Sequence, residues 1–169
     1  MSITLILGPM GSGKSAQLLI YAKREELAKK KVLYISHPDS GSTVKSRNGN
    51  SKDCVGFLTE DTDAFQAIII DEGQFFDNGD ELVNYAEKQA NKGKKIFIAA
   101  LDADFKRENF GNIHKIFPKA ETIKKLKAVC YHCGNDASFS QRLNKENTKQ
   151  KDTDKTHYEA VCRQCYFNN

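Results

Sequence analysis

An octapeptide near the start of the chain constrains the fold more than any other segment. Residues 8–15 read Gly-Pro-Met-Gly-Ser-Gly-Lys-Ser, which has the form G-x-x-x-x-G-K-[ST]. The short apolar run 3–7 precedes it, and a segment of helix-forming composition, 16–29, follows it. A strand that enters a glycine-rich turn and then opens a helix is the context that a phosphate-binding loop requires. The pattern therefore predicts a strand–loop–helix unit that binds a nucleoside triphosphate.

The residues of this loop have distinct expected roles. Glycines let the backbone curl so that successive N–H groups point at phosphate oxygens, and the helix N-terminus adds a partial positive charge. Lys14 is expected to reach the β- and γ-phosphates, and the Ser15 hydroxyl to ligate Mg²⁺. The phosphate-binding residues predicted here are Gly8, Pro9, Met10, Gly11, Ser12, Gly13, Lys14 and Ser15. The alternative is a glycine-rich turn that happens to carry a lysine.

Two adjacent acids, Asp71 and Glu72, follow the apolar run 67–70. Such a run predicts a buried parallel strand, and ligands of parallel sheets bind at the carboxyl ends of the strands. An acid at this place can interact with Mg²⁺ directly or through water. Neighbouring side chains on an extended segment point in different directions, so one acid can face the metal and the other the group that is phosphorylated. Solvated turn carboxylates are the alternative.

The 169 residues suffice for one α/β domain of moderate size and a small appendage. Strands are expected at 3–7, 32–36, 54–58, 67–70 and 94–101, helices at 16–29 and 81–91, and polar loops at 37–50 and 144–155. This alternation predicts a parallel sheet of the P-loop NTPase type with helices on both faces. We place this nucleotide-binding domain at residues 1–119 and a small second domain at residues 120–169.

Four of the five cysteines form two Cys-x-x-Cys pairs: Cys130, Cys133, Cys162 and Cys165. Each pair can supply two ligands to one tetrahedral Zn²⁺, and four thiolates leave no open position, so we expect a structural site. The first alternative is that the cysteines form disulfides, which are rare in cytosolic proteins. The second is a redox function, which is possible for either pair alone and poor for both. His132 and His157 are possible competing ligands. Cys54 is expected to be a small, buried, apolar residue near a strand.

Charge and hydropathy limit the partners that we expect. Lys and Arg number 26 and Asp and Glu 22, a net charge of +4, and the basic residues are scattered. This pattern is typical of a solvated surface, so no nucleic-acid partner is expected. No apolar stretch approaches transmembrane length, and the N-terminal run leads straight into the loop instead of resembling a signal peptide. We therefore expect a cytoplasmic protein without a membrane partner.

Five segments in order along the chain resemble type II thymidine kinases. They are Gly-Pro-Met-x-Ser-Gly-Lys-Ser at 8–15, Asp-Glu-Gly-Gln-Phe-Phe at 71–76, Ala-Ala-Leu-Asp-x-x-Phe at 99–105, Leu-x-Ala-Val-Cys at 126–130 and Tyr-Glu-Ala-Val-Cys-Arg-x-Cys at 158–165. The resemblance implies a P-loop domain and a zinc domain whose lasso loop covers the nucleoside. It further implies transfer of the γ-phosphate of ATP to the 5′-hydroxyl of thymidine, feedback inhibition by dTTP, and a homotetramer.

The resemblance also implies roles for single residues. Glu72 falls on the catalytic general base, while Asp39, Asp71 and Gln74 join the ATP and phosphate site. Phe105 is expected to pack on thymine and Tyr158 to reach the sugar. The substrate-binding residues implied in this way are Met10, Phe75, Leu101, Phe105, Ser140 and Tyr158, with the lasso residues Lys149, Gln150, Lys151, Asp152 and Thr153.

Three departures from the family pattern are visible. The family often has Asp-Thr-Arg after the second strand, whereas this chain retains the acid as Asp39 and lacks the arginine, which leaves Arg142 and Arg47 as candidate cations. The lasso has no Gly-Gly pair, and Ser140 stands where many relatives have threonine.

The alternative function is a zinc-ribbon P-loop ATPase acting on nucleic acid, which would call for a basic stripe interleaved with exposed aromatic residues.

Overall fold

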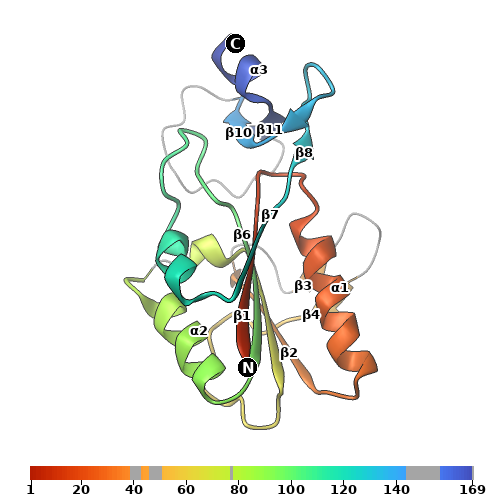
Figure 1. The fold of residues 1–169 in the computed structure, drawn as a ribbon, viewed down its shortest axis with the longest axis vertical. Coiled ribbons are helices and arrows are strands. Elements are labelled where there is room, and N and C mark those ends of the chain that lie inside the picture. Colours follow the sequence, from red (N-terminus) through yellow and green to blue (C-terminus); the bar gives the residue numbers. More distant parts are fainter. Residues whose placement is uncertain (39–42, 46–50, 77, 144–156, 169) are drawn as a thin grey trace.

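The centre of the molecule is a five-stranded parallel sheet with the strand order β2-β5-β6-β1-β7 (Figure 1). The computed structural model describes residues 1–38, 43–45, 51–76, 78–143 and 157–168. The sheet strands are β1 Ser2–Leu7, β2 Val32–Ser36, β5 Ala67–Asp71, β6 Lys95–Ala100 and β7 Thr122–Lys125. The helical elements around it are α1 Lys14–Leu27, η2 Gly73–Phe75, α2 Glu81–Asn91 and η3 Ile113–Lys119. The predicted P-loop type of α/β fold is confirmed.

The two faces of the sheet are covered by different helices because successive strand residues alternate between faces. On one face, Leu5 and Ile70 join the cluster that contains Leu82 and Ala86 of α2. On the other face, Ile6 joins the cluster that contains Leu18 of α1. All five residues of β5 are buried, as expected for a central parallel strand covered on both sides. Figure 1 shows α1 and α2 on opposite sides of the sheet.

The carboxyl ends of β1 and β5 carry the loop and the acid pair that the sequence singled out. β1 ends at Leu7, directly before the loop, and β5 ends at Asp71. The strands are parallel and both pair with β6, so their carboxyl ends lie at the same edge of the sheet. This is where parallel α/β sheets bind ligands.

A second unit follows the sheet, with the strands β8 Ala128–Val129, β9 Asp136–Ala137, β10 Phe139–Arg142 and β11 Tyr158–Val161, and the short helix α3 Arg163–Asn168. These strands form two antiparallel pairs, β8 with β9 and β10 with β11. The unit begins after β7, which pairs with β1 as the edge strand of the main sheet. The boundary at residues 119 and 120 therefore cuts off one strand of the first unit. All four side chains of β7 are exposed, so its sequence lacks the apolar signal of a core strand.

Two further local predictions differ from the structure. Residues 54–58 do not form a strand; within them Val55 makes only an isolated parallel bridge to Ile35. Part of the expected loop 37–50 instead contributes β3 Thr43–Lys45, which pairs with β4 Ser51–Asp53. Cys54 follows β4 and packs against the cluster on the α1 side of the sheet. It is half-buried, whereas the sequence predicted a buried residue. Among the helices of the described ranges, none has the length and hydropathy that a membrane span requires.

Candidate active site and metal centre

The phosphate loop has the backbone conformation that its glycines were expected to allow. Gly8, Gly11 and Gly13 all have positive φ angles, and Gly13 is the left-handed residue directly before α1. A Cβ atom on Gly8 would lie 2.6 Å from the carbonyl oxygen of Leu126 and 2.8 Å from the Ser12 hydroxyl. Since real Cβ atoms do not approach other atoms so closely, only glycine fits where the loop meets the segment after β7.

Lys14, Ser15 and Asp71 meet at the start of α1. The Lys14 Nζ donates to the carbonyl oxygens of Gly8 and Pro9 at 3.0 and 2.8 Å, so its ammonium group lies against the loop. The Ser15 side chain lies near the Asp71 carboxylate and favours its charged form. A lysine, a hydroxyl and a carboxylate at a helix N-terminus are the groups that bind phosphates together with a hard divalent cation.

Asp71 is a buried acid whose charge is poorly compensated by the protein alone. Burial and the neighbouring charge of Glu72 raise the pKa of Asp71 to about 6, although Ser15, the Glu72 N–H and Lys14 act in the opposite direction. A cation bound beside such a carboxylate favours its charged form. The donors present, a hydroxyl and a carboxylate, thus fit Mg²⁺.

Glu72 has an unusual backbone conformation immediately after β5. Its φ and ψ angles are 52° and 42°, in the left-handed region that residues other than glycine rarely adopt. Its N–H donates to the Asp71 Oδ1 at 3.0 Å, and its Oε2 accepts a hydrogen bond of 2.7 Å from the Gln74 Nε2. Backbone strain of this kind persists where the surroundings fix it, and it is often found at functional sites.

Gln74 connects the acid pair to the next strand. Its side chain is fully buried, and its Oε1 accepts the N–H of Leu101 at 2.9 Å while its Nε2 donates to Glu72. Both ends of the amide are therefore engaged within the protein. In this structure Gln74 therefore supports Glu72.

One pocket brings together all six described residues that were expected to bind the nucleoside. It is lined by Met10, Phe75, Leu101, Ala103, Asp104, Phe105, Phe110, Ser140 and Tyr158. Ala103, Asp104 and Phe110 were not predicted from the sequence. Phe110 packs edge-on against Phe75, with ring centroids 5.6 Å apart, but its spacing gives no signal that distinguishes it from a core residue.

The pocket is built from both units. The Ser140 hydroxyl on β10 accepts the N–H of Met10 at 3.0 Å, which joins the second unit to the phosphate loop. Arg142 on the same strand lies over the Phe105 ring at 4.2 Å and over the Tyr158 ring at 4.9 Å, and its Nη2 donates to the Tyr158 hydroxyl. Arg142 thus supports the aromatic wall of the pocket.

The remaining predicted site residues lie outside the residues that the structure describes: Asp39, Lys149, Gln150, Lys151, Asp152 and Thr153, as does the candidate cation Arg47.

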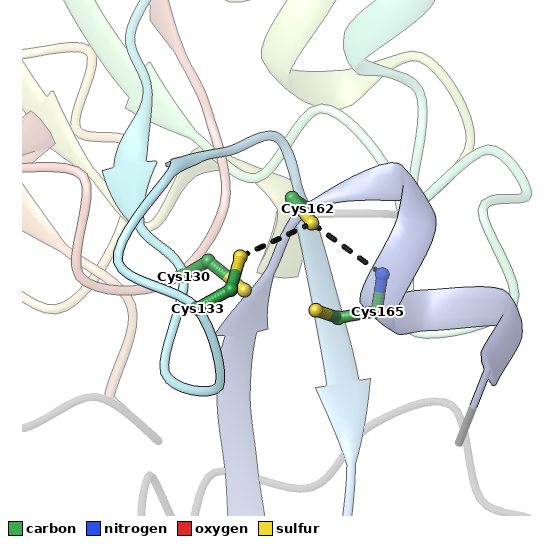
Figure 2. A group of neighbouring side chains, drawn as sticks. All are labelled: Cys130, Cys133, Cys162 and Cys165. Carbon is green, nitrogen blue, oxygen red and sulfur yellow. Dashed lines mark hydrogen bonds between the residues drawn. The ribbon is translucent and has the colours of Figure 1, made fainter.

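The four cysteines of the two Cys-x-x-Cys pairs converge in the second unit (Figure 2). Their sulfur atoms all lie within 4.8 Å of one another, and those of Cys133 and Cys162 are 3.7 Å apart. Zn–S bonds of about 2.3 Å in a tetrahedron place the sulfur atoms about 3.8 Å apart. All five cysteines, each of which the structure describes, are free thiols. The set therefore fits one tetrahedral metal ion, with neither His132 nor His157 in the cluster.

The cysteines differ in how readily they ionise. Burial acts against ionisation of Cys130, but backbone hydrogen bonds from Cys162, Cys133 and His132 outweigh it and lower its pKa to about 6. Hydrogen bonds among the thiols, with burial, raise the pKa of Cys165 to about 12. The environment of Cys130 thus favours its thiolate, whereas that of Cys165 favours its thiol. A divalent cation is what allows four thiolates to share this space.

The parallel sheet, the phosphate loop and the acids at its carboxyl edge define a P-loop nucleotide-binding protein, here with a four-cysteine unit attached. The family model of thymidine kinase matches residues 1–166. The chain is 41% identical to a thymidine kinase of sheeppox virus over 98% of its own length and 96% of the relative. For thymidine kinases of fowlpox and vaccinia viruses the identities are 38% and 36%, each over 99% of this chain and 98% and 97% of the relatives. The chain belongs to the thymidine kinase family, a family of kinases.

Proposed function

We propose that this chain transfers the γ-phosphoryl group of ATP to the 5′-hydroxyl of thymidine and that Glu72 is the general base. The observation that supports the proposal best is the double position of Met10. It belongs to the phosphate loop and also lines the pocket, so a nucleoside in the pocket would lie beside the phosphates. Phosphoryl transfer depends mainly on such positioning and on charge stabilisation.

The phosphate side of the reaction falls to the loop and Asp71. Mg²⁺ bound with ATP neutralises charge on the β- and γ-phosphates. Ser15 and Asp71 would hold the ion, with Asp39 in its water shell. Lys14, already directed over the loop, would donate to phosphate oxygens once it leaves the carbonyl groups of Gly8 and Pro9.

The base side of the reaction falls to Glu72. Its carboxylate would accept the proton of the 5′-hydroxyl as that oxygen attacks phosphorus. The Gln74 amide donates to Oε2 and so limits the rotation of the carboxylate. The fixed left-handed backbone of Glu72 supports the same orientation.

Recognition of thymine would combine the pocket wall with the lasso. Phe105 would pack on the ring, Tyr158 would reach the sugar, and Met10 and Ser140 would lie near the 5-methyl group. Main-chain groups of residues 149–153 would pair with the O2, N3–H and O4 edge. Cytosine presents the opposite donor pattern at N3 and N4, and each buried group left unpaired costs about 1–3 kcal/mol.

A phosphotransfer assay with labelled ATP and the four deoxynucleosides, extended to deoxyuridine, tests this function. Thymidine should be the best substrate, deoxyuridine a fair one, because a methyl group is worth only about 1–3 kcal/mol, and deoxycytidine a very poor one. Equal rates for deoxycytidine and thymidine would contradict base reading by the lasso. Absence of nucleoside phosphorylation, with ATP hydrolysis stimulated by DNA, would replace the proposal by the nucleic-acid ATPase.

We further propose four properties that rest on the chemistry of the cysteines and on the family resemblance. The metal of the four-cysteine site is Zn²⁺, because four thiolates in a closed tetrahedral set are typical of structural zinc. The protein is located in the cytoplasm, because the reducing conditions there keep thiols free to bind a metal. Inhibition by dTTP and a homotetrameric assembly follow from the family resemblance. Metal analysis, inhibition kinetics and sedimentation of the purified chain test these points.

A further inference from the structure

The last helix of the second unit contacts the main chain behind the nucleoside pocket. Tyr166 on α3 donates its hydroxyl hydrogen to the carbonyl oxygen of Phe105 at 2.7 Å, a contact between residues 61 positions apart. Tyr166 is absent from the pocket lining, whereas Phe105 belongs to it. Tyr166 also follows directly after the metal-site residue Cys165, and its N–H donates to the carbonyl oxygen of Cys162 at 3.0 Å.

A second contact of a different kind holds the same segment. The Arg107 guanidinium lies 4.6 Å from the ring centroid of Tyr166 and 4.6 Å from that of Phe167. Arg107 has a φ angle of 67°, so its backbone is in the left-handed region. A cation between aromatic faces is stabilising even at exposed sites. The segment after β6 is thus attached to α3 through both a main-chain carbonyl group and a side chain.

The turn between these two contacts is internally braced. The Asp104 Oδ1 accepts the N–H groups of Lys106 and Glu108 at 2.8 and 2.9 Å, and the Arg107 N–H donates to the Asp104 carbonyl oxygen at 3.0 Å. Because the turn is held in this way, a displacement of the Phe105 main chain also moves the Phe105 ring. On the pocket side, Arg142 lies over that ring.

We propose that Tyr166 is a positioning residue, which transmits the order of the four-cysteine site to the nucleoside pocket by holding Phe105 in place. Cys162 and Cys165 both belong to the metal site, and α3 begins between them at Arg163. Tyr166 on the same helix would transmit this order to Phe105. None of the contacts that link Cys162 and Cys165 to Phe105 through Tyr166 involves the phosphate loop. The coupling therefore affects binding of the nucleoside and not binding of ATP. The identity of the nucleoside rests on the proposed function.

Tyr166→Phe tests the inference because it removes the hydroxyl and keeps the ring against Arg107. We expect the KM and the calorimetric Kd for thymidine to rise about threefold to tenfold, the range for loss of one hydrogen bond. The kcat, the KM for ATP and the bound zinc should stay at the unmutated values. Tyr131→Phe is the matched control, a tyrosine of the same unit that is 74% exposed, and it should change none of these.

Arg107→Gln, which removes the cation and keeps a polar side chain, should raise the same thymidine constants by a smaller factor. The double variant should show less than the product of the two single effects, because both contacts act on one turn. An unchanged thymidine KM and Kd in Tyr166→Phe would overturn the inference. So would an equal rise for ATP, or loss of zinc, since either indicates a general structural role. Failure of the unmutated chain to phosphorylate thymidine would instead refute the proposed function.

Discussion

The two units of this chain are stabilised in different ways. The sheet unit buries two large apolar clusters, one on each face, with residues such as Ile68, Ile70 and Ile98 fully buried. The buried cluster of the second unit consists of Ala128, Cys130, Ala137 and Val161. So small a core rarely suffices for a stable fold, and metals are one of the usual supplements. The phosphate site is therefore supported mainly by apolar packing, whereas the nucleoside pocket also depends on a unit whose small core includes cysteines of the four-cysteine site.

The largest expected effect concerns the chemistry assigned to the sheet unit. Glu72→Gln should lower kcat by about 10²-fold or more, as loss of a positioned base does, while thymidine and ATP still bind. Rates at saturating substrates and calorimetric binding give the two quantities. Glu81→Gln, an exposed acid in the first turn of α2, is the control. A Glu72 variant with nearly normal turnover would assign the base to another group.

The next effect concerns the second unit. The purified chain should hold one Zn²⁺, and Cys130→Ser or Cys162→Ser should lose most of it and melt about 5 °C lower or more. Elemental analysis and calorimetric melting measure both. Cys54→Ser, at a half-buried thiol outside the cluster, should keep its zinc. Reduced, freshly prepared protein without zinc would refute the assignment of the site.

A smaller effect tests the support of the base. Gln74→Leu removes the donor to Glu72 and the acceptor of the Leu101 N–H. We expect kcat to fall about tenfold, in line with the loss of one hydrogen bond to a charged group. Gln89→Leu is matched to it. Gln89 on α2 is equally buried, and its Oε1 accepts a hydrogen bond from the Thr62 hydroxyl. If both variants lose stability alone and neither loses kcat, Gln74 has a purely structural role.

The smallest effect examines an ion pair of the sheet unit. The pKa of Glu25 is lowered, because hydrogen bonds from Lys30 and Lys95, at 2.6 and 2.7 Å, outweigh the opposing effect of burial. Glu25 therefore stabilises the fold above its unfolded pKa, near 4.3, and this contribution is lost as the pH falls through the lower folded value. Glu25→Gln should lower the free energy of unfolding by about 1 kcal/mol at pH 7 and by less near pH 3. Urea titrations at both pH values measure this difference, and an equal loss at both would exclude the ion pair as its cause.

Sequence patterns were most informative where local chemistry determines structure. The helix predicted at 81–91 matches α2, whose apolar residues recur with a helical period. The strand predicted at 32–36 matches β2, which is a short, almost continuous apolar run. β3, β4 and β7 were missed because these strands are short and polar, and pair through the backbone.

The active site divides in a similar way. The loop and the acid pair follow from motifs, and the six pocket residues came from the family resemblance. Tertiary contacts alone bring Asp104 and Phe110 into the pocket and join Gln74 to Leu101. Such contacts leave no periodic signal in the sequence.

The most direct test of the difference between the two units is to titrate one preparation, the zinc-depleted Cys130→Ser variant, with both ligands by calorimetry. ATP with Mg²⁺ should bind within about threefold of the unmutated Kd, because β1 and α1 of the sheet unit hold the two ends of the phosphate loop. Thymidine should bind at least about tenfold more weakly, because Ser140, Tyr158 and the support of Phe105 belong to the second unit. Unchanged thymidine binding without the metal, or equal loss of both ligands, would contradict the account.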